Sequence, residues 1–147
     1  MALNKGIRLS RWLIFFCISF ASFSQEPQLN IIVHSSVSAS QVSTSQLRRI
    51  FSMRQIWWQD QQAIRVYVLA NQNPTHIKFC NTVLAMFPYQ LERVWNKLTY
   101  SGQGEKPIAV ETEAQMLAAV QSDPGAIGYL QYISPDARVK SLRIVEE

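Results

Sequence analysis

The sequence predicts an α/β domain built around a mixed β-sheet with flanking helices. Short apolar runs rich in β-branched residues alternate along the chain with segments whose apolar residues recur at helical spacing, and the connections between them are short. Residues 25–147 number 123, which is enough for one domain with its own core and too few for two. We therefore expect a single domain over residues 25–147, preceded by a separate leader.

Residues 1–24 are expected to be a signal peptide. A basic region and then a nine-residue apolar run, Trp12 to Phe20, precede several small residues. The run is far shorter than the ~20 residues that a membrane-spanning helix needs. This pattern predicts export to the periplasm with cleavage after Ala21 or Ser24, and an uncleaved anchor is the alternative.

Removal of the leader changes the charge balance of the chain. The leader carries three of the fourteen basic residues and none of the ten acidic ones, so the exported chain has a net charge of +1. Nucleic-acid binding depends on a dense basic face, so no nucleic-acid partner is expected. One basic cluster remains, Arg48, Arg49 and Arg54, and a solvated helix face explains it better than an anion patch.

The cysteines predict neither a disulfide nor a lipid anchor. Cys17 lies in the leader, where Phe16 precedes it in place of the small residue of a lipoprotein signal. Cys80 is then left without a partner in the exported chain. It shares an apolar helical stripe with Ile77, Leu84 and Phe87, which favours a buried thiol over a nucleophile.

The first half of the domain is expected to contain two strands and one helix. The apolar run 29–34 predicts a strand, and the serine-rich segment 35–45 predicts a loop. Ser43-Thr44-Ser45-Gln46 has the capping-box pattern, so a helix should begin there and end near Met53. An aromatic turn with Trp57 and Trp58 leads into 64–70, whose alternating pattern marks the best strand of the chain.

The second half alternates helices and strands. Asn73 as a cap and Pro74 at the first helical position predict a helix to about Met86, and Pro88 begins another that ends near Gly102. A strand at 108–110, a capped helix from Thr112 and a strand at 126–130 follow. The charged last strand, 139–145, is expected at an edge of the sheet.

The segment Asp123 to Tyr129 is expected to join a helix to a strand. Pro124 and Gly125 stop the preceding helix, because proline has no N–H to donate and glycine can adopt the left-handed conformation. Gly128 lies inside the strand, where a glycine weakens the strand unless another segment must approach closely. We expect Gly128 to allow such close packing.

No catalytic, metal or cofactor site is predicted. His34 and His76 are 42 positions apart, and no cysteine pair or carboxylate stands at ligand spacing beside them. A small hydrolase would need a nucleophile and a base, and His34 beside Ser35 and Ser36 is a poor candidate because neighbours in an extended segment point to opposite faces.

The one arrangement with a binding rationale lies after the strand 64–70. That strand delivers Asn71, Asn73 and Thr75 to the start of a helix, where free N–H groups and the positive end of the helix dipole favour an anion. A capped helix facing water without a ligand is the alternative, since nearly every helix needs a cap.

The order of these segments resembles the phosphate ABC-transporter substrate-binding family, which has the type II periplasmic binding protein fold. The resemblance covers roughly Ile32 to Tyr132, and its most specific part is the Pro-Gly-Ala-Ile-Gly-Tyr run at 124–129. The other matching segments are Leu47-Arg48-Arg49-Ile50-Phe51, Trp58, Trp95 and Ser101-Gly102. Because family members have two lobes, the resemblance implies a short relative that represents a single lobe.

The resemblance also shows where this chain departs from the family. The phosphate loop of the family presents Ser-Gly-Thr with an arginine nearby, and the corresponding place here is Asn73-Pro74-Thr75 without an arginine beside it. Thr75 matches, whereas the serine, glycine and arginine do not. Proline also removes one of the N–H donors that would hold an oxyanion.

These observations lead to two expectations about function. The first is a non-enzymatic, exported solute-binding-like protein that binds phosphate or another small oxyanion through Asn71, Asn73 and Thr75 for an ABC transporter. The second is an interaction or sensor-accessory module of the cell envelope that has kept the fold and lost the ligand. Nothing in the sequence demands a homo-oligomer, although a second copy would rebuild a two-sided cleft.

Overall fold

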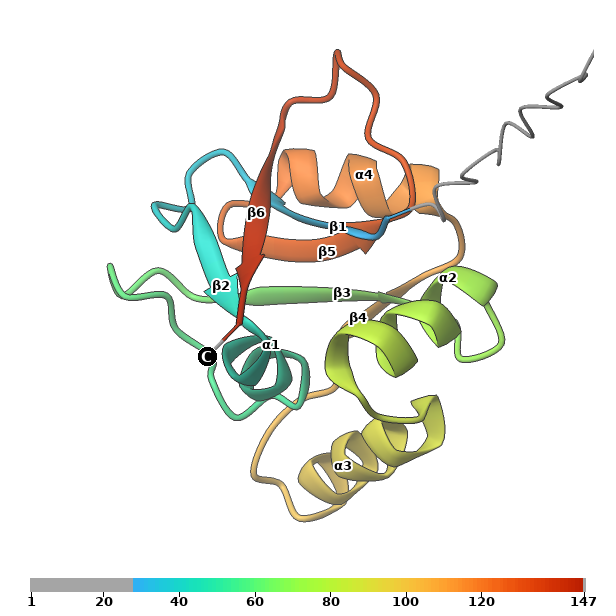
Figure 1. Ribbon diagram of the computed structural model, residues 1–147. Helices are drawn as coiled ribbons and strands as arrows, with labels where there is room; N and C mark the ends of the chain where they lie inside the picture. Colours follow the sequence, from blue (N-terminus) through green and yellow to red (C-terminus); the bar gives the residue numbers. More distant parts are fainter. Residues whose placement is uncertain (1–27, 147) are drawn as a thin grey trace, which may run out of the picture.

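A computed structural model describes residues 28–146, and the expected leader at 1–24 lies outside them. Six strands form one mixed sheet in the order β2-β6-β1-β5-β3-β4, which confirms the expected α/β class (Figure 1). The strands are β1 (Asn30–His34), β2 (Gln41–Ser43), β3 (Arg65–Leu69), β4 (Ile108–Val110), β5 (Ala126–Leu130) and β6 (Val139–Val145).

The helices cover both faces of the sheet (Figure 1). On β5, Gly128 and Tyr129 point to opposite faces because neighbouring strand residues alternate. Met116 of α4 lies against Gly128, whereas Phe51 of α1 and Phe79 pack against the Tyr129 ring. The helical elements are α1 (Thr44–Phe51), α2 (Pro74–Lys78), the π-helix η1 (Phe79–Leu84), α3 (Pro88–Tyr100) and α4 (Glu113–Ser122).

The strands β3, β4 and β5 run parallel to one another at one side of the sheet. Tyr67 of β3 is paired with Ile108 of β4, and Val66 of β3 with Ile127 of β5. The strand β1 is antiparallel to both β5 and β6. Parallel strands end at the same edge, so the segments that follow β3, β4 and β5 are brought together.

The expected edge position of the last strand is wrong. The first part of β6 pairs with β1, and residues 143–145 pair in parallel with β2. The strand β2 forms within the serine-rich segment 35–45, which was expected to be a loop throughout. Its three residues carry too short a pattern to indicate a strand, and their partner lies about a hundred residues away in the sequence.

The expected helix from Pro74 to Met86 is not a uniform α-helix. Its first five residues form α2, after which the chain continues as η1 until Ala85, where φ is 50°. Apolar periodicity indicates that a turn is helical but does not resolve a local widening of the turn. Cys80 lies in η1 and is a buried free thiol, as expected.

The joint between α4 and β5 requires glycine at two positions. Gly125 has φ +81°, and a Cβ there would lie 2.2 Å from the main-chain oxygen of Ala63. Its carbonyl accepts hydrogen bonds from the Trp58 indole nitrogen and from the Arg65 amide. A Cβ on Gly128 would lie 2.4 Å from the Met116 sulfur. The expected close packing at Gly128 is therefore confirmed, and the neighbour is α4.

We predict that Gly125→Ala lowers the free energy of unfolding by at least about 2 kcal/mol, because it combines a left-handed conformation with a clash against main chain. Gly104→Ala is the matched control, since its Cβ would meet only the Leu98 Cβ, at 3.8 Å. Urea denaturation of both variants checks the prediction. Equal losses in the two variants would contradict it.

Candidate functional site

The carboxyl ends of β3, β4 and β5 bring a group of polar side chains to one edge of the sheet. Open α/β sheets usually bind ligands at this edge. Residues Asn71, Asn73 and Thr75 follow β3, Glu113 follows β4, and Gln131 follows β5. We call these five residues the carboxyl-edge cluster.

The structure places the three predicted site residues at this edge, but it gives them different surroundings. Asn73 caps α2, because its side-chain oxygen accepts the Thr75 amide at 2.9 Å. The side-chain nitrogen of Asn73 and the whole side-chain amide of Asn71 have no hydrogen-bond partner within residues 28–146. Thr75 is only 4% exposed.

A hydrogen-bond network joins Thr75 to the ends of the other two parallel strands. The Thr75 hydroxyl donates to Oε1 of Glu113 and accepts from Nε2 of Gln131 at 3.0 Å. The main-chain amide of Gln131 donates to Oε2 of Glu113 at 3.1 Å. The hydroxyl of Thr75 is thus already engaged by a carboxylate.

Glu113 carries the only charge in the carboxyl-edge cluster. It is the first residue of α4, where the positive end of the helix dipole stabilises a carboxylate. A carboxylate has about four lone-pair sites, and two of these accept from Thr75 and Gln131. The remaining sites make Glu113 a hydrogen-bond acceptor for a ligand that carries a proton.

Glu113 and Gln131 were not among the predicted site residues. The sequence placed Glu113 in the first turn of a helix and Gln131 just after a strand, and neither position suggests binding by itself. The signal that identifies them is topological. Had β3, β4 and β5 been recognised as mutually parallel, the residues after each strand would have been expected at one edge.

A buried network lies directly beneath the cluster. The Tyr129 hydroxyl accepts the Leu69 amide at 2.9 Å, which leaves its hydrogen to donate to Nδ1 of His76. The second ring nitrogen of His76 lies 3.4 Å from the Cys80 sulfur. These contacts tie the end of β3 to β5 and to the helix that begins with α2.

Burial keeps the titratable groups of this network neutral. It lowers the pKa of His76 to about 4 and raises the pKa of the Cys80 thiol to about 12. Burial is also the main cause that raises the pKa of Tyr129. A neutral His76 fits the geometry, because its Nδ1 accepts from the Tyr129 hydroxyl.

His34, the last residue of β1, lies against Ser36 in the turn that follows. Nδ1 of His34 lies 2.8 Å from the Ser36 hydroxyl and accepts the Ser36 main-chain amide at 3.0 Å. The same hydroxyl accepts from Gln62 and from the Gly125 amide. These contacts connect the loop to the α4–β5 joint.

Two further findings concern the described part of the chain. No group of three or more histidine, cysteine, aspartate or glutamate side chains in residues 28–146 is placed to hold a metal ion. Across the same residues, the helices are all too short or too polar to cross a membrane.

No protein-family model and no curated protein sequence matches the chain. Solved structures do match it. A protein from Clostridium perfringens, described as a phosphate ABC transporter substrate-binding protein with bound phosphate, superposes with a TM-score of 0.64 at 15% identity. The match covers 79% of this chain and 44% of that protein.

Two other solved structures give the same result. An ABC-type phosphate transport receptor from Vibrio cholerae matches with a TM-score of 0.58 at 15% identity, over 79% of this chain and 45% of the receptor. PstS from Borrelia burgdorferi matches with a TM-score of 0.59 at 13% identity, over 79% of this chain and 46% of PstS. The chain therefore has the fold expected from the Pro-Gly-Ala-Ile-Gly-Tyr resemblance, and it spans less than half the length of these structures.

We predict that protonation of His76 in the unfolded chain destabilises the protein in acid. The pKa of His76 is about 4 in the folded protein and about 6.5 in the unfolded chain, so the stabilisation is complete above pH 6.5 and is lost as the pH falls. The free energy of unfolding should be about 3 kcal/mol lower at pH 4 than at pH 7.5 from this group alone. Urea denaturation at both pH values, compared with His76→Gln, isolates the effect. An equally steep pH dependence in the variant would contradict the prediction.

Proposed function

We propose that this chain is an exported solute-binding-like protein whose carboxyl-edge cluster binds a small oxyanion, with phosphate as the first candidate and an ABC transporter as the recipient. The support is the likeness in fold to phosphate transport receptors, one of which is described with bound phosphate. The cluster also lies at the edge where α/β sheets bind ligands.

The observation that carries the proposal is a pair of unpartnered side-chain amides at the same edge of the sheet as one carboxylate. The side-chain nitrogens of Asn71 and Asn73 are free to donate to ligand oxygens. Glu113 is held by Thr75 and Gln131 and keeps lone pairs that can accept a ligand proton. Donors and acceptor together match an oxyanion that still carries a hydrogen.

This arrangement predicts discrimination between phosphate and sulfate. Phosphate keeps at least one proton at neutral pH and can donate it to Glu113, whereas sulfate has none to donate. A fully ionised oxyanion would face the Glu113 carboxylate without a compensating hydrogen bond, which opposes binding. The Glu113 carboxylate is therefore expected to select phosphate over sulfate.

We predict that isothermal titration detects phosphate binding and no sulfate binding. Glu113→Gln keeps the shape of the side chain and removes its charge, so the preference for phosphate over sulfate should disappear. Thr75→Val removes the hydroxyl that holds Glu113 and should weaken phosphate binding about tenfold.

Two controls belong to this titration. Thr75→Ser keeps the hydroxyl and should bind like the natural protein, and Gln72→Ala changes an exposed neighbour of the cluster. Absence of heat with millimolar phosphate, or sulfate binding equal to phosphate binding in the natural protein, would reject the proposal.

A second candidate function is an interaction module of the cell envelope. Ile56, Trp57 and Ile108 are large exposed apolar side chains, at 50%, 55% and 39%, and all three line one groove of about 550 Å³ beside β4. The groove is mainly apolar, and exposed apolar surface of this kind marks protein contacts. This candidate needs no solute.

We predict for this candidate that the double variant Trp57→Ser, Ile108→Ser abolishes a specific cross-link to one envelope protein. Phosphate binding should be unaffected, because the groove and the carboxyl-edge cluster share no residue. The exposed pair Tyr89→Ser, Tyr100→Ser serves as the control. An identical cross-link pattern in all three proteins would reject this second function.

A further inference from the structure

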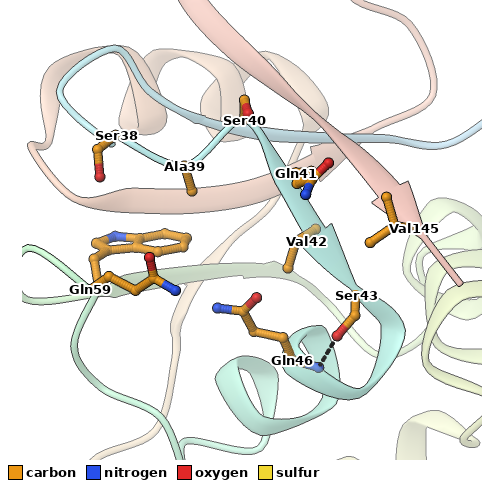
Figure 2. Close-up of a pocket in the computed structure, with 10 residues that line it drawn as sticks. Ser38, Ala39, Ser40, Gln41, Val42, Ser43, Gln46, Gln59 and Val145 are labelled. Atoms are coloured by element: carbon orange, nitrogen blue, oxygen red, sulfur yellow. Dashed lines mark hydrogen bonds between the residues drawn. The ribbon is translucent and has the colours of Figure 1, made fainter. Parts of the chain in front are cut away.

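A polar pocket of about 550 Å³ lies beside β2 and shares no residue with the carboxyl-edge cluster (Figure 2). Six of its lining residues are consecutive, 38–43, so one wall is a continuous stretch of chain that ends in β2. The other lining residues are Gln46, Trp58, Gln59 and Val145.

The main chain of Gln41 points away from the sheet. The Arg143 amide donates to the carbonyl of Ser40, so in the parallel β2–β6 ladder the next residue that turns its groups toward β6 is Val42. Gln41 lies between these two residues and directs its N–H and C=O to the opposite side. That side is the outer edge of the sheet, because β2 is the last strand in the order.

No charged side chain lines the pocket, and Asp60 and Lys140, two charges that contact its lining, are both hydrogen-bonded to Ser38. Its polar side chains are serines and glutamines, and its apolar ones are Ala39, Val42, Trp58 and Val145. The side-chain amides of Gln46 and Gln59 have no hydrogen-bond partner within the described chain. Figure 2 shows both side chains on the side of β2 that faces away from Val145.

The two edges of the sheet differ in protection. Proteins usually guard an exposed edge strand with charged residues or proline. The outer strand β4 follows Glu105, Lys106 and Pro107, whereas the stretch 38–43 that includes β2 contains neither a charge nor a proline. The three-residue edge of β2 therefore lacks both of these guards, and its main chain can pair with a short extended segment.

We propose that this pocket binds an extended, uncharged peptide segment of a partner protein, which pairs with the main chain of Gln41 and contacts the amides of Gln46 and Gln59. Strand addition to an open sheet edge is a general mode of peptide recognition. The lining residues offer no counter-ion to a charged side chain, which would lose water on entry, so neutral segments are preferred.

The test uses the purified protein and a pool of blocked heptapeptides built from alanine, glycine, serine, threonine, valine and glutamine. Two matched pools carry a central glutamate or a central lysine. We expect affinity selection to retain the uncharged pool about tenfold better than either charged pool. Hydrogen exchange with the best peptide should slow at the Gln41 amide and stay unchanged at Glu111, beyond β4.

Three variants separate main-chain from side-chain recognition. Gln41→Pro removes the N–H that points into the pocket and leaves the β2–β6 hydrogen bonds in place, so it should abolish binding. Gln41→Ala loses the same side-chain contact to Arg143 and keeps the N–H, so it should bind normally. If Gln41→Pro does not fold, the double variant Gln46→Ala, Gln59→Ala tests the side-chain amides of the pocket. We expect this double variant to bind the peptide more weakly. Equal retention of all pools, equal binding by Gln41→Pro and Gln41→Ala, or protection at β4 would overturn the proposal.

Discussion

The Tyr129 hydroxyl is the contact on which the rest of the site depends. It accepts the last amide of β3 and donates to His76, so it joins β5, β3 and the helix that begins with α2 in one buried network. Its ring stacks on Phe79 and contacts Phe51, which holds the helical layer to the same strand. The opposite face of β5 admits α4 because Gly128 has no side chain. Both helical layers are therefore positioned by two neighbouring residues of β5.

That arrangement explains why the carboxyl-edge cluster is already ordered without a ligand. Tyr129 fixes where β3 ends, so Asn73 and Thr75 begin α2 at a defined place. Glu113 begins α4, and α4 is held against β5 by the contact between Met116 and Gly128. Thr75 and Glu113 consequently meet through the packing of two separate helices, and their hydrogen bond costs little additional ordering.

The sequence identified most elements because the local signals were strong. The Asn73–Pro74 cap, the Thr112 cap and the Pro124–Gly125 stop are each sufficient to place an element boundary. The strand β2 escaped prediction because pairing with distant β6, and not a local pattern, makes it a strand. The roles of Glu113 and Gln131 escaped for the same reason, since both depend on the order of strands in the sheet. Local sequence patterns predicted the individual helices and strands, whereas pairing between distant segments determined which of them lie side by side.

The position of Arg65 bears on the oxyanion binding that we propose for the cluster. Arg65 begins β3 and forms a 3.2 Å ion pair with Asp123, whereas the cluster begins after the other end of that strand. Five strand residues span about 16 Å, which exceeds the distance over which an exposed charge acts in physiological salt. Arg65 therefore cannot offset the charge of Glu113. On the proposed function, a carboxylate that Arg65 does not neutralise makes selection of the oxyanion rest on matched hydrogen bonds, one of which the ligand supplies to Glu113 with its own proton.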